Sequence, residues 1–286
     1  MNTHTNKLMH ASIIGEGKSN VILKLNEYYP GKVIRLCKRF PHVSSNNEYL
    51  SKNKAFQLRF NSEFTGISNH ISNAIYTVLD KNTDIELFLI IQEVLEERFI
   101  KIDEERIMII ILRNYLNFSI TEEVHVDYYT KIYNDFMAEF KPKWAKMNLF
   151  EYKKCINYPT IDQRDKQISF CRNCNHIIDT KPQTYCYNGC KGLGSIKLFK
   201  DFLTYLNNPN NIVQKIFQIQ KQLVQVVVED EDIDMFYVNA LIALRDISIF
   251  YNLKTKEESL IDLDYKDISS AEVYYHKMQK EWRYLD

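Results

Sequence analysis

The sequence has no apolar run long enough to cross a membrane. Its longest uninterrupted apolar run, IMIIIL, covers residues 107–112, whereas a membrane-spanning helix needs about 20 apolar residues. The first residues, MNTHTNKLMHAS, also lack the apolar core of a secretory signal. We therefore expect no membrane partner, and we expect the protein in the cytoplasm, in the nucleus or in both.

An excess of charge of one sign is also absent. Lysine plus arginine and aspartate plus glutamate each total 37, so the formal net charge is zero. Proteins that bind nucleic acid through their overall field carry a basic excess, and we therefore expect no nucleic-acid partner. A site for a polyanion must instead come from local clustering of cations. The 286 residues, of which 45% are hydrophobic, suffice for a sizeable core and two lobes.

Cysteines are few, but four of the six lie close together. Cys171-x-x-Cys174 is followed by Cys186 and Cys190, and His176 is a rival fourth ligand. In an intracellular chain this clustering favours a metal site over disulfides, and the spacing resembles the two knuckles of a structural zinc site. Reduced thiols packed in a core, or a disulfide, are the alternatives. A zinc ion held here would be structural and not catalytic.

Alternating apolar residues predict two β-hairpins, at 13–38 and at 246–266. The β-branched run at 106–112 predicts a buried strand. Helical periodicity is found at 67–79 and at 236–244. The sum is an α+β fold. Two polar stretches are interpreted as turn-rich or solvated segments, namely 41–54 and 226–234.

The sequence GEGKS contains glycines of the kind that approach phosphates. A Walker A loop needs a glycine five residues before Gly17, where Ser12 stands, and a helix directly afterwards, where the chain alternates as a strand does. Gly15-x-Gly17-x-x-Asn20 within a hairpin is instead similar to the glycine-rich loop that covers nucleotide phosphates in kinases. A plain structural turn is the alternative.

The next strand carries a cation on an apolar face. Alternation places Val33, Arg35 and Cys37 on the same side. Kinase-like folds position a cation, usually lysine, on such a strand to hold nucleotide phosphates. The alternative is an arginine that pairs with an acid in the core.

Two lysines lie close together in AEFKPKW. Pro142 favours an extended segment at a sheet edge, which places Lys141 and Lys143 on one face. Two ammonium groups about 4 Å apart repel by on the order of 4 kcal/mol at an effective dielectric constant near 20. A ligand rich in phosphate would turn this repulsion into attraction. Surface lysines that protect an edge strand from aggregation are the alternative.

Acidic residues recur in the last predicted hairpin. We expect Asp246 to share a strand face with Ser248, and we expect Asp262, Asp264 and Lys266 to share a face of the next strand. Mg²⁺ prefers oxygen ligands, typically one or two carboxylates together with nucleotide phosphates and water. Acids on two adjacent strands, combined with a glycine-loop hairpin, predict phosphoryl transfer. Taken singly, each acid is more typical of a loop or surface position.

Eight stretches come in the order of one known family: GEGKSNVIL, GKVIRLCK, SSNNEYLSKN, EFKPKW, CRNCNH, NNPNNI, ALRDISIF and DLDYK, spanning residues 15–266. In these the sequence resembles the inositol-pentakisphosphate 2-kinase family, specifically its small fungal members. The family transfers the γ-phosphate of ATP to the axial 2-hydroxyl of inositol 1,3,4,5,6-pentakisphosphate. The resemblance implies a two-lobed kinase-like fold, with a nucleotide lobe at 1–118, a metal and inositol phosphate lobe at 119–286, and a monomer.

The resemblance also implies residue roles. The loop and strand that hold ATP would contribute Gly15, Gly17, Asn20 and Arg35. Lys141 would lie near the transferred phosphate. Asp246 matches the acid of the family's [RK]-D-C-S motif, with Ile247 in place of cysteine, and would orient or deprotonate the 2-hydroxyl and contact the metal. The Mg²⁺ ligands would be Asp246 and Asp262, with Asp264 in support.

The substrate phosphates would contact Lys143, Arg172, His176, Asn211, Lys266, Tyr275 and Lys277. The chain departs from the family pattern at several points. Asp267 stands where the family has proline, Asn175 replaces a methionine, and Lys181 is the nearest match to a missing lysine.

A competing interpretation is a zinc-knuckle module that binds protein or RNA without catalysis. It is motivated by the cysteine cluster and by the 19 tyrosines and 16 phenylalanines. Such a module predicts nucleic-acid binding that weakens steeply with salt. The balanced charge and the lack of a basic stretch count against it.

Overall fold

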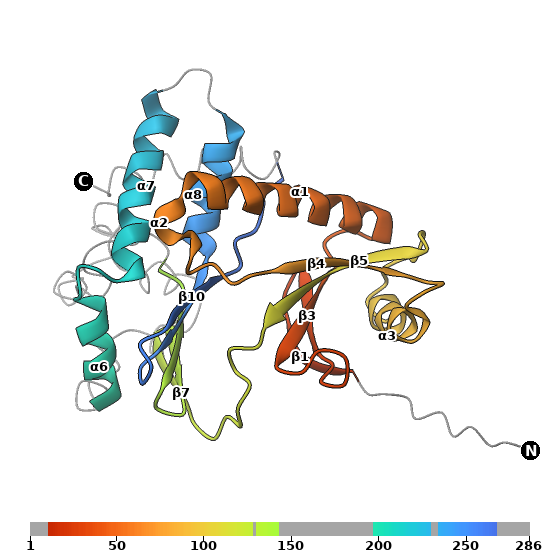
Figure 1. The fold of residues 1–286 in the computed structure, drawn as a ribbon, viewed down its shortest axis with the longest axis horizontal. Coiled ribbons are helices and arrows are strands. Elements are labelled where there is room, and N and C mark those ends of the chain that lie inside the picture. The colour runs from red at the N-terminus through yellow and green to blue at the C-terminus, as the bar shows by residue number, and fades with distance from the viewer. Residues whose placement is uncertain (1–10, 128–129, 143–196, 230–233, 268–286) are drawn as a thin grey trace, which may run out of the picture. The chain divides into compact units, whose positions relative to one another are not determined.

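The structure is a computed structural model of the chain, and it describes residues 11–127, 130–142, 197–229 and 234–267. The chain divides into two compact units. Unit 1 comprises Met1–Ala55 and Ser72–Ser119, and unit 2 comprises Phe56–Ile71 and Ile120–Asp286. Each unit has its own five-stranded antiparallel sheet (Figure 1). The expected α+β fold class is therefore confirmed at this level.

The sheet of unit 1 has the strand order β1-β2-β3-β5-β4. Its strands are β1 (Ser12–Glu16), β2 (Asn20–Lys24), β3 (Lys32–Cys37), β4 (Ile75–Asp80) and β5 (Arg106–Arg113). The predicted hairpin at 13–38 is confirmed, with β1 added to it as a third strand. The predicted buried strand at 106–112 is also confirmed, since β5 lies inside the sheet between β3 and β4.

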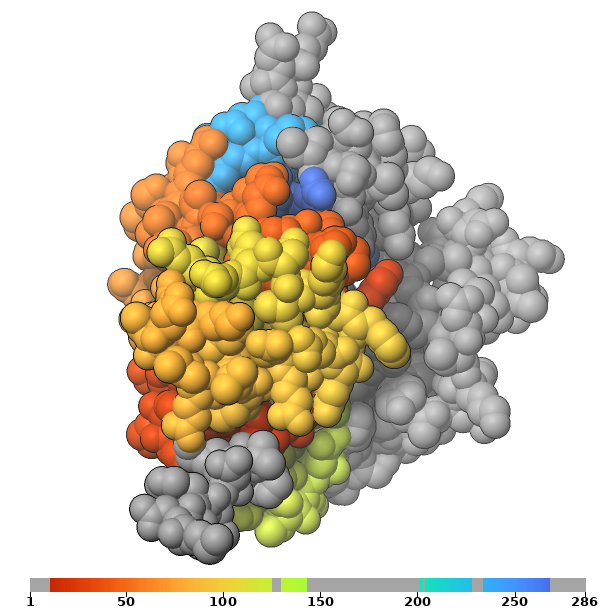
Figure 2. Space-filling view, turned by 90° about the vertical axis from the view of Figure 1, so that its right-hand side faces the viewer, coloured from red at the N-terminus to blue at the C-terminus, as the bar shows by residue number. Residues whose placement is uncertain are grey.

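Two helices belong wholly or partly to unit 1, namely α1 (Val43–Glu63) and α3 (Ile85–Glu96). The residues of α3 that face the core include Phe88 and Ile91, both fully buried. Its other face carries Ile85 and Leu89, which are exposed and one helical turn apart. In Figure 2 the amber and yellow segments of unit 1, which include α3 and β5, face the viewer.

Helix α1 contradicts the prediction that residues 41–54 are a turn-rich segment. The face that α1 buries includes Asn46 and Asn53 among its apolar side chains, which weakens the apolar periodicity. Asn46 accepts a hydrogen bond from the backbone N–H of Phe40, and Asn53 donates one to the hydroxyl of Tyr76. Buried polar residues made this helix hard to recognise in the sequence, because their hydrogen-bond partners are supplied only in the folded chain.

The predicted helix at 67–79 is also wrong. Residues Thr65–Ser68 form only the short helix α2, and the chain then extends into β4. Strand β4 pairs with β5 from Ile75 opposite Ile111 to Asp80 opposite Arg106. Long-range pairing with a buried strand overrides the local helical pattern.

The sheet of unit 2 has the strand order β10-β9-β8-β7-β6. Its strands are β6 (Glu123–Asp127), β7 (Thr130–Tyr133), β8 (Met137–Phe140), β9 (Ser248–Asn252) and β10 (Glu258–Ile261). The predicted second hairpin is confirmed as β9 and β10. Strand β8 is the middle strand, so the predicted sheet-edge position of AEFKPKW is wrong. Pro142 lies beyond the paired residues, where its missing N–H costs no ladder hydrogen bond.

Three longer helices complete the described part of unit 2. They are α6 (Lys197–Leu206), α7 (Ile212–Glu229) and α8 (Met235–Asp246), and α7 packs beside α8 (Figure 1). Helix α8 confirms the predicted helix at 236–244, whereas the predicted loop at 226–234 is wrong at its start, because Val227 lies buried within α7. Of the helices described, none combines the length and apolarity that crossing a bilayer requires.

Helix α8 begins at a charged cap. The carboxylate of Asp234 accepts a hydrogen bond of 2.8 Å from the backbone N–H of Phe236 and one of 2.6 Å from the guanidinium of Arg59. Asp234→Asn keeps a capping side chain but breaks the ion pair, whose partners are nearly half exposed. It should lower the free energy of unfolding by at most about 1 kcal/mol. Asp234→Ala also loses the cap and should cost about 0.5–2 kcal/mol, as measured by urea unfolding.

The effect of Asp234 should depend on pH in a defined direction. Hydrogen bonds from the backbone of Phe236 and from Arg59 hold the pKa of this carboxyl below its ordinary value of 3.8. The stabilisation is therefore complete above 3.8 and is lost as pH falls through the folded-state pKa. The stability gap between wild type and Asp234→Ala should shrink in that acidic range. A gap that stayed constant there would contradict the charged cap.

Candidate active site

Three strands of unit 2 have their ends at one edge of the sheet. Phe140 of β8 pairs with Ile249 of β9, and Ile261 of β10 pairs with Ser248 of β9. Because the neighbours are antiparallel, β8 and β10 end where β9 begins. Three of the predicted site residues lie beside these strand ends, and they are Lys141, Asp246 and Asp262.

Lys141 joins the two acidic segments. Its ammonium group donates a hydrogen bond of 3.2 Å to the backbone carbonyl of Asp246 and lies 3.8 Å from a carboxylate oxygen of Asp262. The Lys141 and Asp262 side chains are each 36% exposed, so a ligand in solvent can reach them. The structure thus brings Lys141 together with two aspartates that lie more than 100 residues after it in the sequence.

Asp246 is the last residue of α8 and not a strand residue, so the prediction that it shares a strand face with Ser248 is wrong. A carboxylate at a helix C-terminus is repelled by the unpaired carbonyl groups there. The ammonium of Lys266, 3.8 Å from Asp246 Oδ2, offsets this repulsion. The backbone N–H of Lys266 in turn donates to Asn239 of α8, which fixes the segment that carries this lysine.

Asp262 follows the last residue of β10 and has a left-handed backbone, with φ of 64°. The prediction that Asp262 and Asp264 share a strand face is therefore wrong, because the strand ends before both. Left-handed φ is tolerated by aspartate and asparagine better than by most residues. The hydroxyl of Ser248 donates to Asp262 Oδ2 at 3.0 Å, and the backbone N–H of Asp264 donates to the Asp262 carbonyl.

The donors at this edge fit a hard cation. Within the described ranges, no group of three or more histidine, cysteine, aspartate or glutamate residues is arranged to hold a metal. Mg²⁺ needs only one or two protein carboxylates when phosphates supply the other ligands. Asp246 and Asp262 provide oxygen donors of this type, and the ammonium of Lys141 shows that a cation already sits among their oxygens.

The glycine loop of unit 1 connects β1 to β2. The backbone N–H of Gly17 donates to the carbonyl of Asn20 at 2.9 Å, and the N–H of Lys38 donates to the carbonyl of Ser19 at 2.8 Å. Among the described glycines, only Gly31 has a positive φ. A Cβ atom on Gly17 would meet nothing within 4 Å, and one on Gly15 would make ordinary contact with Ile22. Neither glycine is required by packing, and the role of the loop toward a nucleotide stays a prediction.

Arg35 lies in the middle of this sheet. It pairs with Ile22 of β2 and Ile110 of β5 and is only 6% exposed. Val33 and Cys37, on the same face, are buried as well. The expected cation on an apolar face is therefore confirmed, and its role toward a nucleotide stays a prediction.

Asn211 has a structural position. It is 3% exposed and precedes the first residue of α7. Its side-chain oxygen accepts from the backbone N–H of Gln214 at 2.9 Å, and its amide donates to the carbonyls of Tyr205 and Leu206 at the end of α6. These bonds cap one helix and close the other. A contact with substrate stays a prediction for this residue.

The other predicted site residues lie outside the described residues. They are Lys143, Arg172, His176, Tyr275 and Lys277 for the substrate and Cys171, Cys174, Cys186 and Cys190 for zinc. Three residues that were not identified from the sequence also have side chains that make contacts near the predicted sites. They are Asn239, which accepts from the backbone N–H of Lys266, and Glu16 and Arg98, which form an ion pair beside the glycine loop. Asn239 could have been found in the sequence, because it is a polar residue within the largely apolar helix α8, where it is buried.

Comparison with known proteins gives one informative likeness. No protein-family model matches the chain. The inositol-pentakisphosphate 2-kinase of Saccharomyces cerevisiae is 25% identical over 315 aligned residues. The alignment covers 94% of this chain and 99% of the yeast protein, so it includes most of both units.

Proposed function

We infer that the chain belongs to the inositol-pentakisphosphate 2-kinase family, and we propose that it transfers the γ-phosphate of ATP to the 2-hydroxyl of inositol 1,3,4,5,6-pentakisphosphate. The observation that carries this proposal is the likeness to the yeast enzyme, which extends over nearly the full length of both chains. The convergence of Lys141, Asp246 and Asp262 at one sheet edge supports it, because phosphoryl transfer depends on positioned cations and carboxylates.

The proposed reaction assigns each group a balanced role. The 2-oxygen of the inositol forms a bond to the γ-phosphorus, while the bond from this phosphorus to the β,γ-bridging oxygen breaks and ADP leaves. The proton of the 2-hydroxyl passes to the carboxylate of Asp246. The ammonium of Lys141 balances negative charge on the group in transfer. Mg²⁺, when bound, neutralises charge on the nucleotide phosphates, and Asp246 and Asp262, supported by Asp264, would hold it.

The nucleotide and the inositol are proposed to use different parts of the chain. Residues 1–118 would form the nucleotide lobe, with Gly15, Gly17 and Asn20 in the loop over ATP and Arg35 on its phosphates. Residues 119–286 would hold the inositol phosphates, with Lys266 among the contacts. The remaining proposed substrate contacts are Lys143, Arg172, His176, Asn211, Tyr275 and Lys277. A structural zinc site at the four clustered cysteines also stays a prediction.

The deciding assay incubates the protein with ATP, Mg²⁺ and inositol 1,3,4,5,6-pentakisphosphate and separates the inositol phosphates by chromatography. We expect inositol hexakisphosphate together with an equal amount of ADP. Failure to form the hexakisphosphate would remove the proposal. RNA binding that weakened steeply with salt, in a protein without this activity, would favour the zinc-knuckle module instead.

Asp262→Asn should raise the Mg²⁺ concentration needed for the half-maximal rate by about tenfold, because a charged oxygen ligand becomes neutral. Asparagine tolerates the left-handed backbone of Asp262 as aspartate does, so the fold should be kept. The rate is measured as Mg²⁺ is titrated at fixed ATP and inositol pentakisphosphate.

Asp135→Asn is the matched control for this substitution. Asp135 also has φ of 64° and lies in the turn before β8, at the opposite end of the sheet. Its replacement should leave the Mg²⁺ dependence unchanged. If Asp262→Asn and Asp135→Asn gave the same Mg²⁺ curve as wild type, Asp262 would not be a metal ligand.

A further inference from the structure

The glycine loop is weakly held by its own backbone. Among the described strands, β1 is at the edge of its sheet and pairs with β2 alone. A register shift between Ile13 and Gly15 interrupts even this pairing. Four of the five residues of β1 are exposed. Edge strands with few buried contacts open at low free-energy cost, so a loop that must meet phosphates at defined distances needs a second support.

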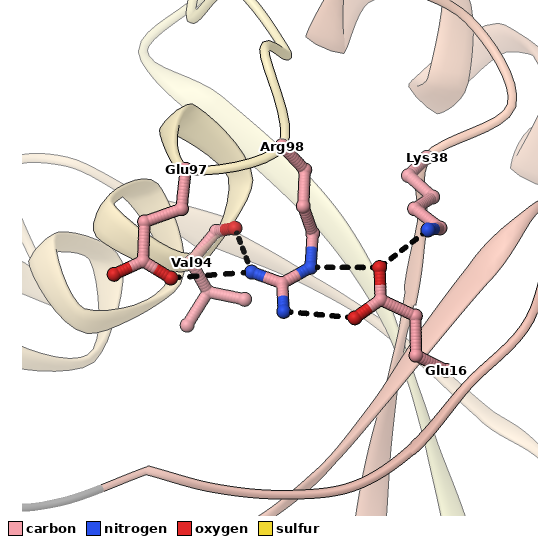
Figure 3. Close-up of polar contacts among 5 residues, drawn as sticks. All are labelled: Glu16, Lys38, Val94, Glu97 and Arg98. Carbon is pink, nitrogen blue, oxygen red and sulfur yellow. Dashed lines mark hydrogen bonds and ion pairs between the residues drawn. The ribbon is translucent and has the colours of Figure 1, made fainter.

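Glu16, between the two loop glycines, provides this support (Figure 3). One of its carboxylate oxygens accepts from Arg98 Nη2 at 3.0 Å, and the other accepts from Arg98 Nε at 3.2 Å and from the ammonium of Lys38. A two-pronged arginine–carboxylate pair fixes orientation as well as distance. The end of β1 is thereby tied to residues that lie 22 and 82 positions further along the chain.

Arg98 is itself anchored. Its Nη1 donates to the carbonyl of Val94 at 2.7 Å, in the last turn of α3, and lies 3.4 Å from a carboxylate oxygen of Glu97 (Figure 3). The Arg98 side chain is 14% exposed and that of Lys38 is 18% exposed. Helix α3 is packed into the core of unit 1 through residues such as Phe88. The carboxylate of Glu16 is therefore held against a rigid element.

Lys38 supports the loop in two ways. Its ammonium contacts Glu16 at the beginning of the loop, and its backbone N–H donates to the carbonyl of Ser19 near the end of the loop. Hydrogen bonds from Arg98 and Lys38 hold the pKa of the Glu16 carboxyl below its ordinary value of 4.5, so the carboxylate is ionised at neutral pH. We call these three side chains, Glu16, Lys38 and Arg98, the loop clamp.

We propose that Glu16 is a positioning residue for nucleotide binding, and that the loop clamp holds the Gly15–Gly17 segment in a position where the loop can meet the phosphates of ATP. This inference rests on the proposed function. Glu16 itself does not contact the nucleotide in this account. Its effect comes from ordering the loop before ATP arrives, which reduces the entropy lost on binding.

The test compares Glu16→Gln, Arg98→Gln and the double variant with wild type. Titration calorimetry with a non-hydrolysable Mg-ATP analogue should show a Kd raised by about tenfold in each single variant, the effect of losing charge-assisted contacts. The double variant should be no weaker than either single one, because both substitutions break the same clamp. KM for ATP should rise by the same factor, while KM for inositol pentakisphosphate stays within about twofold.

Glu48→Gln is the matched control. Glu48 pairs with Lys52 on the exposed face of α1, and the pKa of its carboxyl is likewise lowered by its lysine, but no hydrogen bond joins it to the loop. This variant should bind the analogue as wild type does. Arg98→Lys keeps the charge but loses the forked contact, so its Kd should lie between those of wild type and Arg98→Gln.

Several results would overturn the inference. One is a lower Kd in Glu16→Gln, which would mean that Glu16 competes with phosphates for the two cations. Another is a fall in melting temperature with equal losses for both substrates, which would mean a purely structural role. Unchanged binding by Glu16→Gln, when wild type makes inositol hexakisphosphate, would remove this inference alone. Wild-type protein that bound no Mg-ATP analogue would remove the proposed function as well.

Discussion

Asp246→Asn is expected to lower kcat by about 10²- to 10⁴-fold, the usual contribution of general acid–base catalysis. Asparagine is nearly the same size as aspartate but accepts no proton from the 2-hydroxyl and has no charge for Mg²⁺. The loss should appear in kcat for hexakisphosphate formation, measured at saturating ATP, Mg²⁺ and inositol pentakisphosphate. KM for the inositol should change far less than kcat.

The position of Asp246 makes this loss separable from a loss of stability. The substitution gives up the contact with Lys266, but it also removes a negative charge from the C-terminus of α8, where such a charge is unfavourable by about 0.3–1 kcal/mol. These two effects oppose one another, so the free energy of unfolding should change little. An inactive variant that unfolds at the wild-type urea concentration therefore reports on chemistry.

Asp201→Asn serves as the control for Asp246→Asn, since Asp201 is an exposed aspartate within α6. It should keep the wild-type kcat. Product formed at an undiminished rate by Asp246→Asn would contradict the assignment of Asp246 as the proton acceptor and would leave the kinase proposal to be decided by the wild-type assay.

The strands β2, β3, β5, β9 and β10 were predicted from sequence because their signals are local, whereas β4 was predicted as a helix. The β9–β10 hairpin and β5 each show their apolar pattern within a few residues. Helix α1 was missed because two of its buried positions hold Asn46 and Asn53, and only the folded chain supplies their partners. Polar residues that are satisfied in the tertiary structure cannot be told from surface residues in one sequence.

The candidate site was predicted in its residues but not in its local geometry. Asp246 and Asp262 were expected on strand faces, whereas one ends a helix and the other adopts a left-handed turn. What brings them together is strand register, which sets Ile261 opposite Ser248. The loop clamp was not predicted at all, because Glu16 occupies an unspecified position of the Gly15-x-Gly17-x-x-Asn20 pattern and Arg98, 82 positions further along, belongs to no motif.

Lys141→Met is expected to lower kcat by about 10²- to 10³-fold, the size of the effect when a preorganised positive group is removed from a transition state that gains negative charge. Methionine keeps the length and apolar stem of lysine but lacks the ammonium that contacts the Asp246 carbonyl and Asp262. Because these partners are partly exposed, water can replace the ammonium, and the stability loss should stay below about 1 kcal/mol.

Lys131→Met is the natural control for Lys141→Met, since Lys131 lies on the neighbouring strand β7 and is similarly exposed, with its own ion pair to Glu123 at 2.9 Å. It should keep the wild-type rate, because its carboxylate partner lies on β6, away from the strand ends that hold Asp246 and Asp262.

The role of Lys141 is decided by whether Lys141→Met changes kcat or KM. A rise in KM for either substrate at unchanged kcat would make Lys141 a ground-state binding group, because an interaction made only in the transition state must appear in kcat.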